Sequence, residues 1–325
     1  MSNNVLRFIR VAFVVVALAT TAAIGLELLM VGTLDSSARS PGSPRAPTAL
    51  PATPTWTDGG AVVLVGAGDI ADCETFEDEL TADLVETIPG VVFTLGDNAN
   101  SDGSVEDFEA CYGPSWGRTS IKDRTRPAVG DNEYRTAGAE GYFSYFGEAT
   151  DDGSGGYYAY DAGEWRVYVL NSNCGEIRGC SSGSTQGQWL RNDLAANPRR
   201  CVLAVWHHPL FSSGPHAPTR STADLWQILE EAGAELILNG NDHHYERFDP
   251  QTFEGVADPE GILAIIAGTG GSRPVGFQSP IDNSVVRKSH VFGVLRIELA
   301  PRSYAFEFIT VAGPEFSDRG TGTCH

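Results

Sequence analysis

Short apolar runs recur along the chain, and most of them end abruptly in polar residues. Continuous runs of four to six apolar positions are typical of strands that are covered on both faces of a sheet. We predict such strands at residues 61–66, 91–95, 165–170, 201–206 and 235–238. The last third of the chain has the same character, with strands expected at residues 262–267, 291–299 and 304–309.

Apolar residues at helical spacing lie between several of these runs. They predict helices at residues 74–87, 186–196 and 221–232, with Ser221 as the N-cap of the third. The strand–helix–strand order predicts a right-handed parallel crossover, and hence an α/β fold. Residues 138–160 are rich in glycine and tyrosine, and we expect loops and an edge hairpin there.

The first 35 residues form a separate segment. Arg7 and Arg10 precede an apolar run from Val11 to Leu34, which is long enough to span a bilayer at ~20 residues. The position of the two arginines favours an anchor whose N-terminus is cytoplasmic, and a cleaved signal peptide is the alternative. Residues 36–58 are rich in proline and serine and predict a linker, so the folded domain is expected at 59–325. Both alternatives place this domain outside the cytoplasm, membrane-anchored or secreted.

Acidic residues outnumber basic residues by 42 to 22 in the chain of 325 residues. A surface with this excess of negative charge repels nucleic acid, so we exclude DNA and RNA as partners. The only membrane contact expected is through the N-terminal segment. The oligomeric state is left open by the sequence.

All six cysteines follow the apolar segment, on the exported side. An even number in that setting predicts disulfides, although six cysteines allow fifteen pairings and free thiols are the alternative. A zinc cluster is disfavoured because no two cysteines have the short paired spacing that it needs. The pairs that we expect are Cys73–Cys111, Cys174–Cys180 and Cys201–Cys324.

The polar residues that follow five predicted strands are all types that bind metal ions. Carboxylates and imidazoles that converge on one edge of a sheet hold divalent cations, and a shared carboxylate can bridge two of them. These residues are Asp69, Asp97, Asp131 with Asn132, His207 with His208, and Asn241 with His243. Each Gly-Asp pair taken alone is also ordinary turn chemistry, so it is the ordered set that carries the prediction.

This order of motifs resembles that of the calcineurin-like metallophosphoesterases. The string GNDHHYER at residues 240–247 is similar to the Gly-His-Asp-His-x-Tyr-Glu-Arg motif of the purple acid phosphatase branch. The resemblance implies a four-layer α/β/β/α sandwich of two mixed sheets flanked by helices. It also implies a site for two divalent metal ions, and hydrolysis of phosphate monoesters of small molecules by attack of a metal-bound hydroxide.

Matched by position, the family's metal ligands fall on six residues of this chain. The resemblance implies that Asp69, Asp97 and His243 hold the first ion, with Asp97 bridging to the second. The second ion would take Asp97, Asp131, His207 and Asn241. His216 matches a family histidine that faces the substrate phosphate. His208 and His244 are expected to support the site rather than to bind metal.

Four positions depart from the family pattern. Asp131 replaces a ligand asparagine, Asn132 a catalytic histidine, Asn241 a ligand histidine, and Asn100 the tyrosine that gives the purple colour. Because no histidine precedes His207, the expected ligands are mostly oxygen atoms, which suit manganese, iron, magnesium or calcium better than zinc. An amide at position 132 can donate a hydrogen bond but relays no proton, so we expect weakened activity.

The same substitutions favour a second hypothesis. The chain would then be a degenerate, non-catalytic binding protein at the cell surface that keeps the fold. A third hypothesis, a disulfide-stapled structural domain, leaves the ordered strand-end residues unexplained. Under the first hypothesis, that the chain is a metal-dependent phosphatase, Asp97, Asn132 and His216 act in catalysis.

Overall fold

The computed structural model describes residues 60–150, 155–216, 219–311, 313 and 316–325. The predicted N-terminal anchor (1–35) and linker (36–58) lie outside these residues. Within the described part of the chain, no helix has the length and apolar character needed to cross a bilayer.

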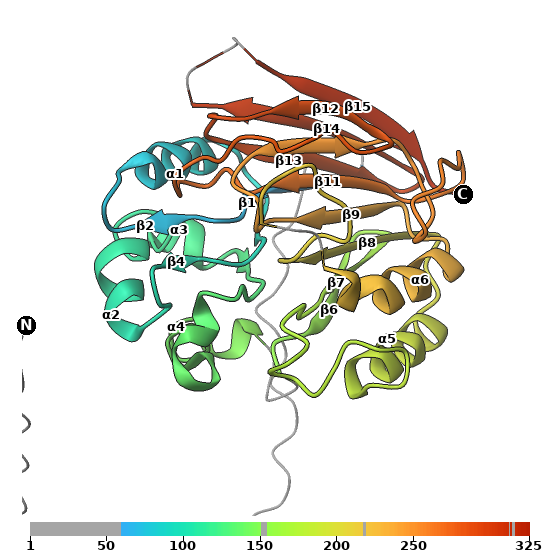
Figure 1. Cartoon of the computed structure of the whole chain (residues 1–325), viewed down its shortest axis with the longest axis horizontal. Coiled ribbons are helices and arrows are strands. Elements are labelled where there is room, and N and C mark those ends of the chain that lie inside the picture. Colours follow the sequence, from blue (N-terminus) through green and yellow to red (C-terminus); the bar gives the residue numbers. More distant parts are fainter. Residues whose placement is uncertain (1–59, 151–154, 217–218, 312, 314–315) are drawn as a thin grey trace, which may run out of the picture. The chain divides into compact units, whose positions relative to one another are not determined.

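Two mixed β-sheets form the centre of the domain (Figure 1). The six-stranded sheet has the order β15-β14-β13-β1-β3-β5, and its strands are β1 (Val62–Ala67), β3 (Val91–Thr94), β5 (Thr125–Arg126), β13 (Gly293–Ala300), β14 (Ser303–Thr310) and β15 (Asp318–Thr323). The seven-stranded sheet has the order β12-β10-β11-β9-β8-β7-β6, and its strands are β6 (Tyr158–Ala162), β7 (Trp165–Val169), β8 (Cys201–Trp206), β9 (Leu236–Asn239), β10 (Tyr245–Phe248), β11 (Leu263–Ala267) and β12 (Ser284–Lys288). A small pair joins β2 (Ala71–Asp72) to β4 (Ala99–Asn100).

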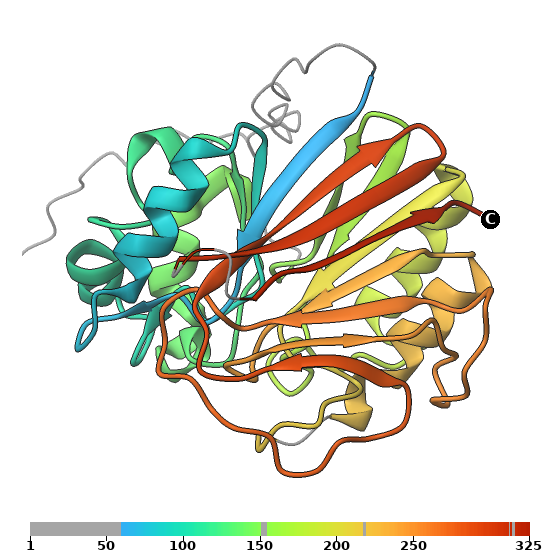
Figure 2. The same cartoon turned by 90° about the horizontal axis from the view of Figure 1, so that it is seen from above.

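Helices cover the outer faces of both sheets (Figure 2). They are α1 (Glu77–Thr87), α2 (Val105–Asp107), α3 (Thr119–Lys122), α4 (Glu140–Phe146), α5 (Thr185–Ala196) and α6 (Ala223–Glu231). Side chains of α1, α3 and α4 pack on the outer face of the six-stranded sheet, and those of α5 and α6 pack on the seven-stranded sheet. The predicted four-layer sandwich is therefore confirmed.

The largest hydrophobic core lies between the two sheets. Leu64 of β1 and Phe93 of β3 share this layer with Leu203 of β8 and Leu238 of β9, and all four are fully buried. The neighbouring residues of the same strands face the helices, which is why these strands show continuous apolar runs. Both faces of each central strand are thus covered.

Parallel pairing brings the carboxyl ends of the central strands to one edge. Strand β1 pairs in parallel with β3, and β3 with β5. In the other sheet, β7, β8, β9 and β11 are also parallel. Open α/β sheets bind ligands at this edge, where the chain leaves each strand for a loop.

Two of the elements predicted from the sequence differ in the structure. Residues 138–160 contain helix α4, although β6 does form the expected hairpin with β7. Ser221 is not an N-cap, because α6 begins at Ala223 after a short 3-10 turn, Arg220–Thr222. The hydroxyl of Thr219 instead accepts a hydrogen bond from the backbone N–H of Ser221, at 3.3 Å.

Three disulfides are present, and all six cysteines are paired as predicted: Cys73–Cys111, Cys174–Cys180 and Cys201–Cys324. The second closes a short loop that follows β7. The third ties the start of β8, in one sheet, to the residue after β15, in the other.

Candidate metal centre

Three of the predicted ligands lie directly beyond strand ends with left-handed backbone angles. The φ values are +57° for Asp69 after β1, +50° for Asp97 after β3 and +69° for Asn241 after β9. Non-glycine residues adopt such angles rarely, and cluster at functional sites when they do. Gly130 makes room for Asp97, since a Cβ at position 130 would lie 2.1 Å from Asp97 Oδ1.

Carboxylates and imidazoles converge at this edge of the two sheets. His207 Nε2 lies 3.1 Å from Asp131 Oδ1 and 3.4 Å from Asp97 Oδ1. His243 Nε2 lies 3.3 Å from Asp69 Oδ1. We call the six predicted ligands the polar rim: Asp69, Asp97, Asp131, His207, Asn241 and His243. Ligand atoms of Asp69, Asp97 and His207 lie within 4.8 Å of one another, which is close enough for one ion.

Both rim histidines are oriented by backbone carbonyls. His207 Nδ1 lies 2.7 Å from the carbonyl oxygen of Leu95, and His243 Nδ1 lies 2.7 Å from that of Arg273. A carbonyl only accepts hydrogen bonds, so each Nδ1 carries the proton. Each Nε2 is therefore left as the potential metal-binding atom, which is the usual arrangement of ligand histidines.

The negative charge of the rim raises the pKa of both imidazoles. Burial works to lower the pKa of His207, but the charge of Asp97 and a hydrogen bond with Asp131 outweigh it, and the pKa is raised well above its ordinary value. Burial likewise opposes the charge of Asp69 at His243, whose pKa is raised to about 9. The rim therefore favours bound positive charge.

Two buried polar atoms of the rim have no hydrogen-bond partner among the described residues. They are Asp69 Oδ1 and Asn241 Nδ2. Asp69 Oδ1 lies 3.3 Å from His243 Nε2, and a buried carboxylate oxygen is stabilised by a positive charge, either on this imidazole or on a bound cation. The donor set also fits divalent ions, because it combines carboxylate oxygens, an amide and two oriented imidazoles. The residues present thus fit a metal centre.

The side chain of Glu133 holds the backbone of the two loops that carry Asp97 and Asp131. It is fully buried and accepts backbone N–H bonds from Gly130 at 2.6 Å, Asn98 at 2.6 Å and Asp97 at 3.1 Å. One side chain thus fixes both loops that carry Asp97 and Asp131. Sequence reasoning missed this role, although the Glu in the family's Gly-Asn-His-Glu motif marked the position.

The loop that carries His216 is anchored to two buried acids. The backbone N–H of His216 donates to Asp242 Oδ1 at 3.1 Å, and Ser213 donates to Glu246 through its N–H at 2.9 Å and its hydroxyl at 2.5 Å. His216 Nδ1 lies 2.7 Å from the Asn241 carbonyl oxygen. Its ring centroid is 5.2 Å from that of His243, so the predicted phosphate-facing histidine lies at the rim.

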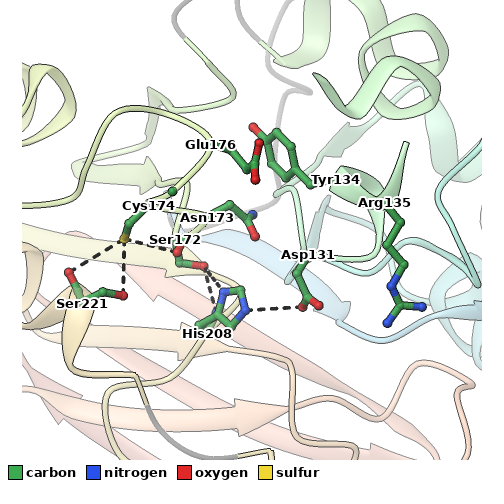
Figure 3. A pocket seen from close by; sticks show the side chains of 10 residues that line it. Asp131, Tyr134, Arg135, Ser172, Asn173, Cys174, Glu176, His208 and Ser221 are labelled. Atoms are coloured by element: carbon green, nitrogen blue, oxygen red, sulfur yellow. Dashed lines mark hydrogen bonds and ion pairs between the residues drawn. The ribbon is translucent and has the colours of Figure 1, made fainter. Parts of the chain in front are cut away.

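The two remaining histidines differ in position. His244 is fully buried and contacts Glu246 Oε2 at 3.3 Å, away from the rim carboxylates. His208 Nε2 lies 3.4 Å from Asp131 Oδ1, and its Nδ1 lies 2.9 Å from Ser172 Oγ. His208 also lines a cavity beside Asp131 (Figure 3). This cavity was not predicted, because most of its lining residues lie in loops without a motif.

Comparisons with known proteins find similar sequences and structures, although no family model matches the chain. Purple acid phosphatase 15 of Arabidopsis thaliana is 31% identical over 124 residues, which cover 36% of this chain and 22% of that protein. Tartrate-resistant acid phosphatase type 5 of Mus musculus is 26% identical over 137 residues, or 40% of this chain and 39% of that protein. The chain thus spans well under half the length of both relatives.

A solved structure extends the likeness to most of the domain. Purple acid phosphatase PPD1 from yellow lupin superposes with a TM-score of 0.69 at 16% identity, over 84% of this chain and 55% of that chain. This chain has the calcineurin-like metallophosphoesterase fold. Within that fold, its sequence likeness is to the purple acid phosphatase branch.

Two of the residues that depart from the family pattern, Asn132 and Asn100, contact each other. The Asn132 amide donates to Asn100 Oδ1, and the Asn100 amide donates to Ser272 Oγ. The backbone N–H of Asn132 also donates to Asp97 Oδ1 at 2.9 Å. At these two positions the purple acid phosphatase pattern has histidine and tyrosine. Here the two asparagine side chains are joined to each other by a hydrogen bond beside the polar rim.

Proposed function

We propose that this chain is an extracytoplasmic, metal-dependent phosphatase that hydrolyses phosphate monoesters of small molecules with reduced turnover. The observation that supports it is the convergence of the polar rim, where five chain segments bring together three carboxylates and two oriented imidazoles. The likeness to acid phosphatases supports the reaction class.

We propose that the six rim residues hold two divalent ions. Asp69, Asp97 and His243 would hold the first, and Asp97, Asp131, His207 and Asn241 the second. Bound ions would supply a water of lowered pKa and polarise a phosphoryl oxygen. Because oxygen atoms dominate the ligand set, manganese, magnesium, iron or calcium fits it better than zinc.

Residues of the chain itself would orient the phosphate. His216 stands at the rim with its Nδ1–H donated to the Asn241 carbonyl, so its Nε2 would donate to a phosphoryl oxygen in the imidazolium form. Asn132 uses one amide hydrogen on Asn100 and keeps the other for a second phosphoryl oxygen. An amide there cannot give a proton to the departing alkoxide, and the loss of such a group lowers rates by about 10²–10⁴-fold.

The test is hydrolysis of p-nitrophenyl phosphate by the purified full chain. Manganese should support turnover, a chelator should remove it, and manganese should also raise the unfolding temperature, because an ion that binds the folded state stabilises it. A chain that neither gains stability nor hydrolyses the ester with any of the fitting ions is not this phosphatase.

The location outside the cytoplasm is part of the same proposal. Three disulfides are rare in a reducing cytosol. The apolar segment after Arg10 would anchor the domain or direct its secretion. Protease added to intact cells should digest the domain, or the domain should be found in the medium. A protected, cell-associated domain would contradict this location.

A further inference from the structure

A polar cavity of about 460 Å³, open to solvent, adjoins the rim at Asp131 (Figure 3). Its walls include Tyr134, Asn173, Glu176, His208 and Ser221. Among the described residues that line it, none has an aliphatic side chain. The volume is in the range of ordinary ligand pockets, but the lining is far more polar than usual.

One wall of this cavity is held rigid by covalent and backbone contacts. Gly175 and Glu176 belong to the loop that the Cys174–Cys180 disulfide closes. Inside the loop, the N–H of Glu176 donates to the Asn173 carbonyl at 2.9 Å, and that of Gly179 donates to the Cys174 carbonyl at 2.8 Å. A wall fixed in this way is preorganised, so little ordering entropy is lost when a ligand binds.

Asn173 ties this wall to the rim. Its amide Nδ2 donates to the Gly130 carbonyl at 3.2 Å and to Asn171 Oδ1 at 3.0 Å, and the residue is only 8% exposed. Gly130 immediately precedes Asp131. The cavity is therefore held at a fixed position beside a proposed metal ligand, within reach of a group esterified to a phosphate at the rim.

A carboxylate and an aromatic ring lie side by side in the wall of the cavity. Figure 3 shows the Glu176 carboxylate beside the Tyr134 ring. Within the described residues, that carboxylate makes no hydrogen bond or ion pair, whereas the Tyr134 hydroxyl accepts a bond from Asn171 at 2.8 Å. A free carboxylate near an aromatic face suits a ligand that has both O–H donors and a C–H face.

We propose that this cavity binds a hydroxyl-rich, uncharged leaving group, so that sugar and polyol phosphates are the preferred substrates. This rests on the proposed phosphatase function. An alkyl chain packed against the exposed Glu176 carboxylate would displace its hydrating water without replacing the hydrogen bonds, which is unfavourable for a charged group. An ammonium group would suit Glu176, but the guanidinium of Arg135 lines the same cavity and disfavours it.

The first test compares leaving groups of different chemistry in the manganese-loaded full chain. The ratio of kcat/KM for glucose 6-phosphate to that for butyl phosphate should be at least about tenfold, the effect of one hydrogen bond to a charged group. Glu176→Ala should lower this ratio about tenfold. Glu254→Ala, an exposed acid in the loop between β10 and β11, should leave it unchanged.

Two kinetic outcomes would overturn the proposal. One is a wild-type ratio near one, or a ratio that Glu176→Ala does not change. The other is a preference for phosphoethanolamine over glucose 6-phosphate, which would assign the cavity to ammonium groups. A structural defect in the variant would lower both rates together and leave the ratio intact.

A binding measurement tests whether the cavity binds a sugar independently of ester hydrolysis. Saturation-transfer NMR with methyl glucoside needs neither metal nor turnover. The full chain should transfer saturation to the glucoside, and Glu176→Ala should abolish the transfer. No transfer to the wild-type chain would overturn the cavity assignment. Transfer without hydrolysis of any ester would instead reject the proposed function and leave the cavity as a sugar-binding site.

Discussion

The two sheets contribute different chemistry to the polar rim. Loops of the six-stranded sheet supply only carboxylates, namely Asp69, Asp97 and Asp131, whereas loops of the seven-stranded sheet supply His207 and His243. The loops of Asp97 and Asp131 are held by one buried side chain, Glu133, and the two imidazoles are oriented by backbone carbonyls. A complete set of metal ligands therefore forms only where the two sheets meet. The loops of one sheet alone would not hold the ions.

The largest effect is expected on the carboxylate side, at the proposed bridging residue. Asp97→Ala should lower hydrolysis of p-nitrophenyl phosphate by at least about 10³-fold, because both ions lose a ligand. The matched control is Asp123→Ala, an exposed aspartate outside the rim. Activity of the Asp97 variant within tenfold of the wild type would reject the two-ion proposal.

The next effect tests what holds the carboxylate loops. Glu133→Gln leaves at least one buried N–H without an acceptor and should lower the free energy of unfolding by about 2–4 kcal/mol. Urea denaturation measures this, with exposed Glu140→Gln as control. Equal stability of the two variants would show that the loops are fixed by other contacts.

A gain-of-function variant tests the proton donor that the carboxylate side lacks. Asn132→His places a proton-transferring group beside Asp97 and should raise kcat by about tenfold to a hundredfold. Asn192→His, on the exposed face of α5, is the matched control. If turnover of the Asn132 variant stays at the wild-type level, proton transfer to the leaving group does not limit the reaction.

A smaller change is expected on the imidazole side. Asn241→His replaces an amide by a nitrogen ligand that zinc prefers, and should strengthen zinc binding about tenfold relative to manganese. Competition between the two ions, followed by metal analysis, measures this. An unchanged preference would exclude position 241 from the ligand set.

Per pH unit, the smallest expected effect comes from two buried acids outside the rim. Burial raises the pKa of Asp78 and that of Glu235 to about 7. A raised carboxyl pKa stabilises the fold fully below the unfolded pKa and loses this contribution as the pH rises through 7. Stability should thus fall from pH 4 to pH 7, by at most about 1.4 kcal/mol per pH unit for each group.

Each of the variants Asp78→Asn and Glu235→Gln should flatten part of that pH dependence, because neither new side chain titrates. Chemical denaturation of both variants and of the wild type between pH 4 and pH 8 measures it. Identical slopes in all three proteins would show that the two acids ionise as freely in the fold as in the unfolded chain.

Sequence reasoning was most successful where one pattern had a single physical cause. The central strands were predictable because burial on both faces gives continuous apolar runs, as in β8. Helix α4 was missed because EGYFSYF has weak helical preference, and the burial of Tyr142 and Phe146 in the fold stabilises it instead. Strand β15 was missed for a similar reason, since DRGTGT carries no apolar pattern and only its pairing with β14 defines it.

The rim was predictable as a set of residue types, but its supports were not. A strand-end aspartate can be read from the sequence, whereas the contacts of Glu133 with three separate backbone groups cannot. The cavity beside Asp131 was hidden for the same reason, because Tyr134, Glu176 and Ser221 are far apart in the chain.

The Cys201–Cys324 bridge has a practical consequence for assays. It joins the two sheets at the start of β8, whereas His207 follows the end of that strand. Removing this bridge alone would release the chain terminus and widen the unfolded ensemble, yet leave the rim end of the strands untouched. The double variant Cys201→Ser, Cys324→Ser should therefore unfold at a lower temperature while keeping its initial rate of p-nitrophenyl phosphate hydrolysis in the cold.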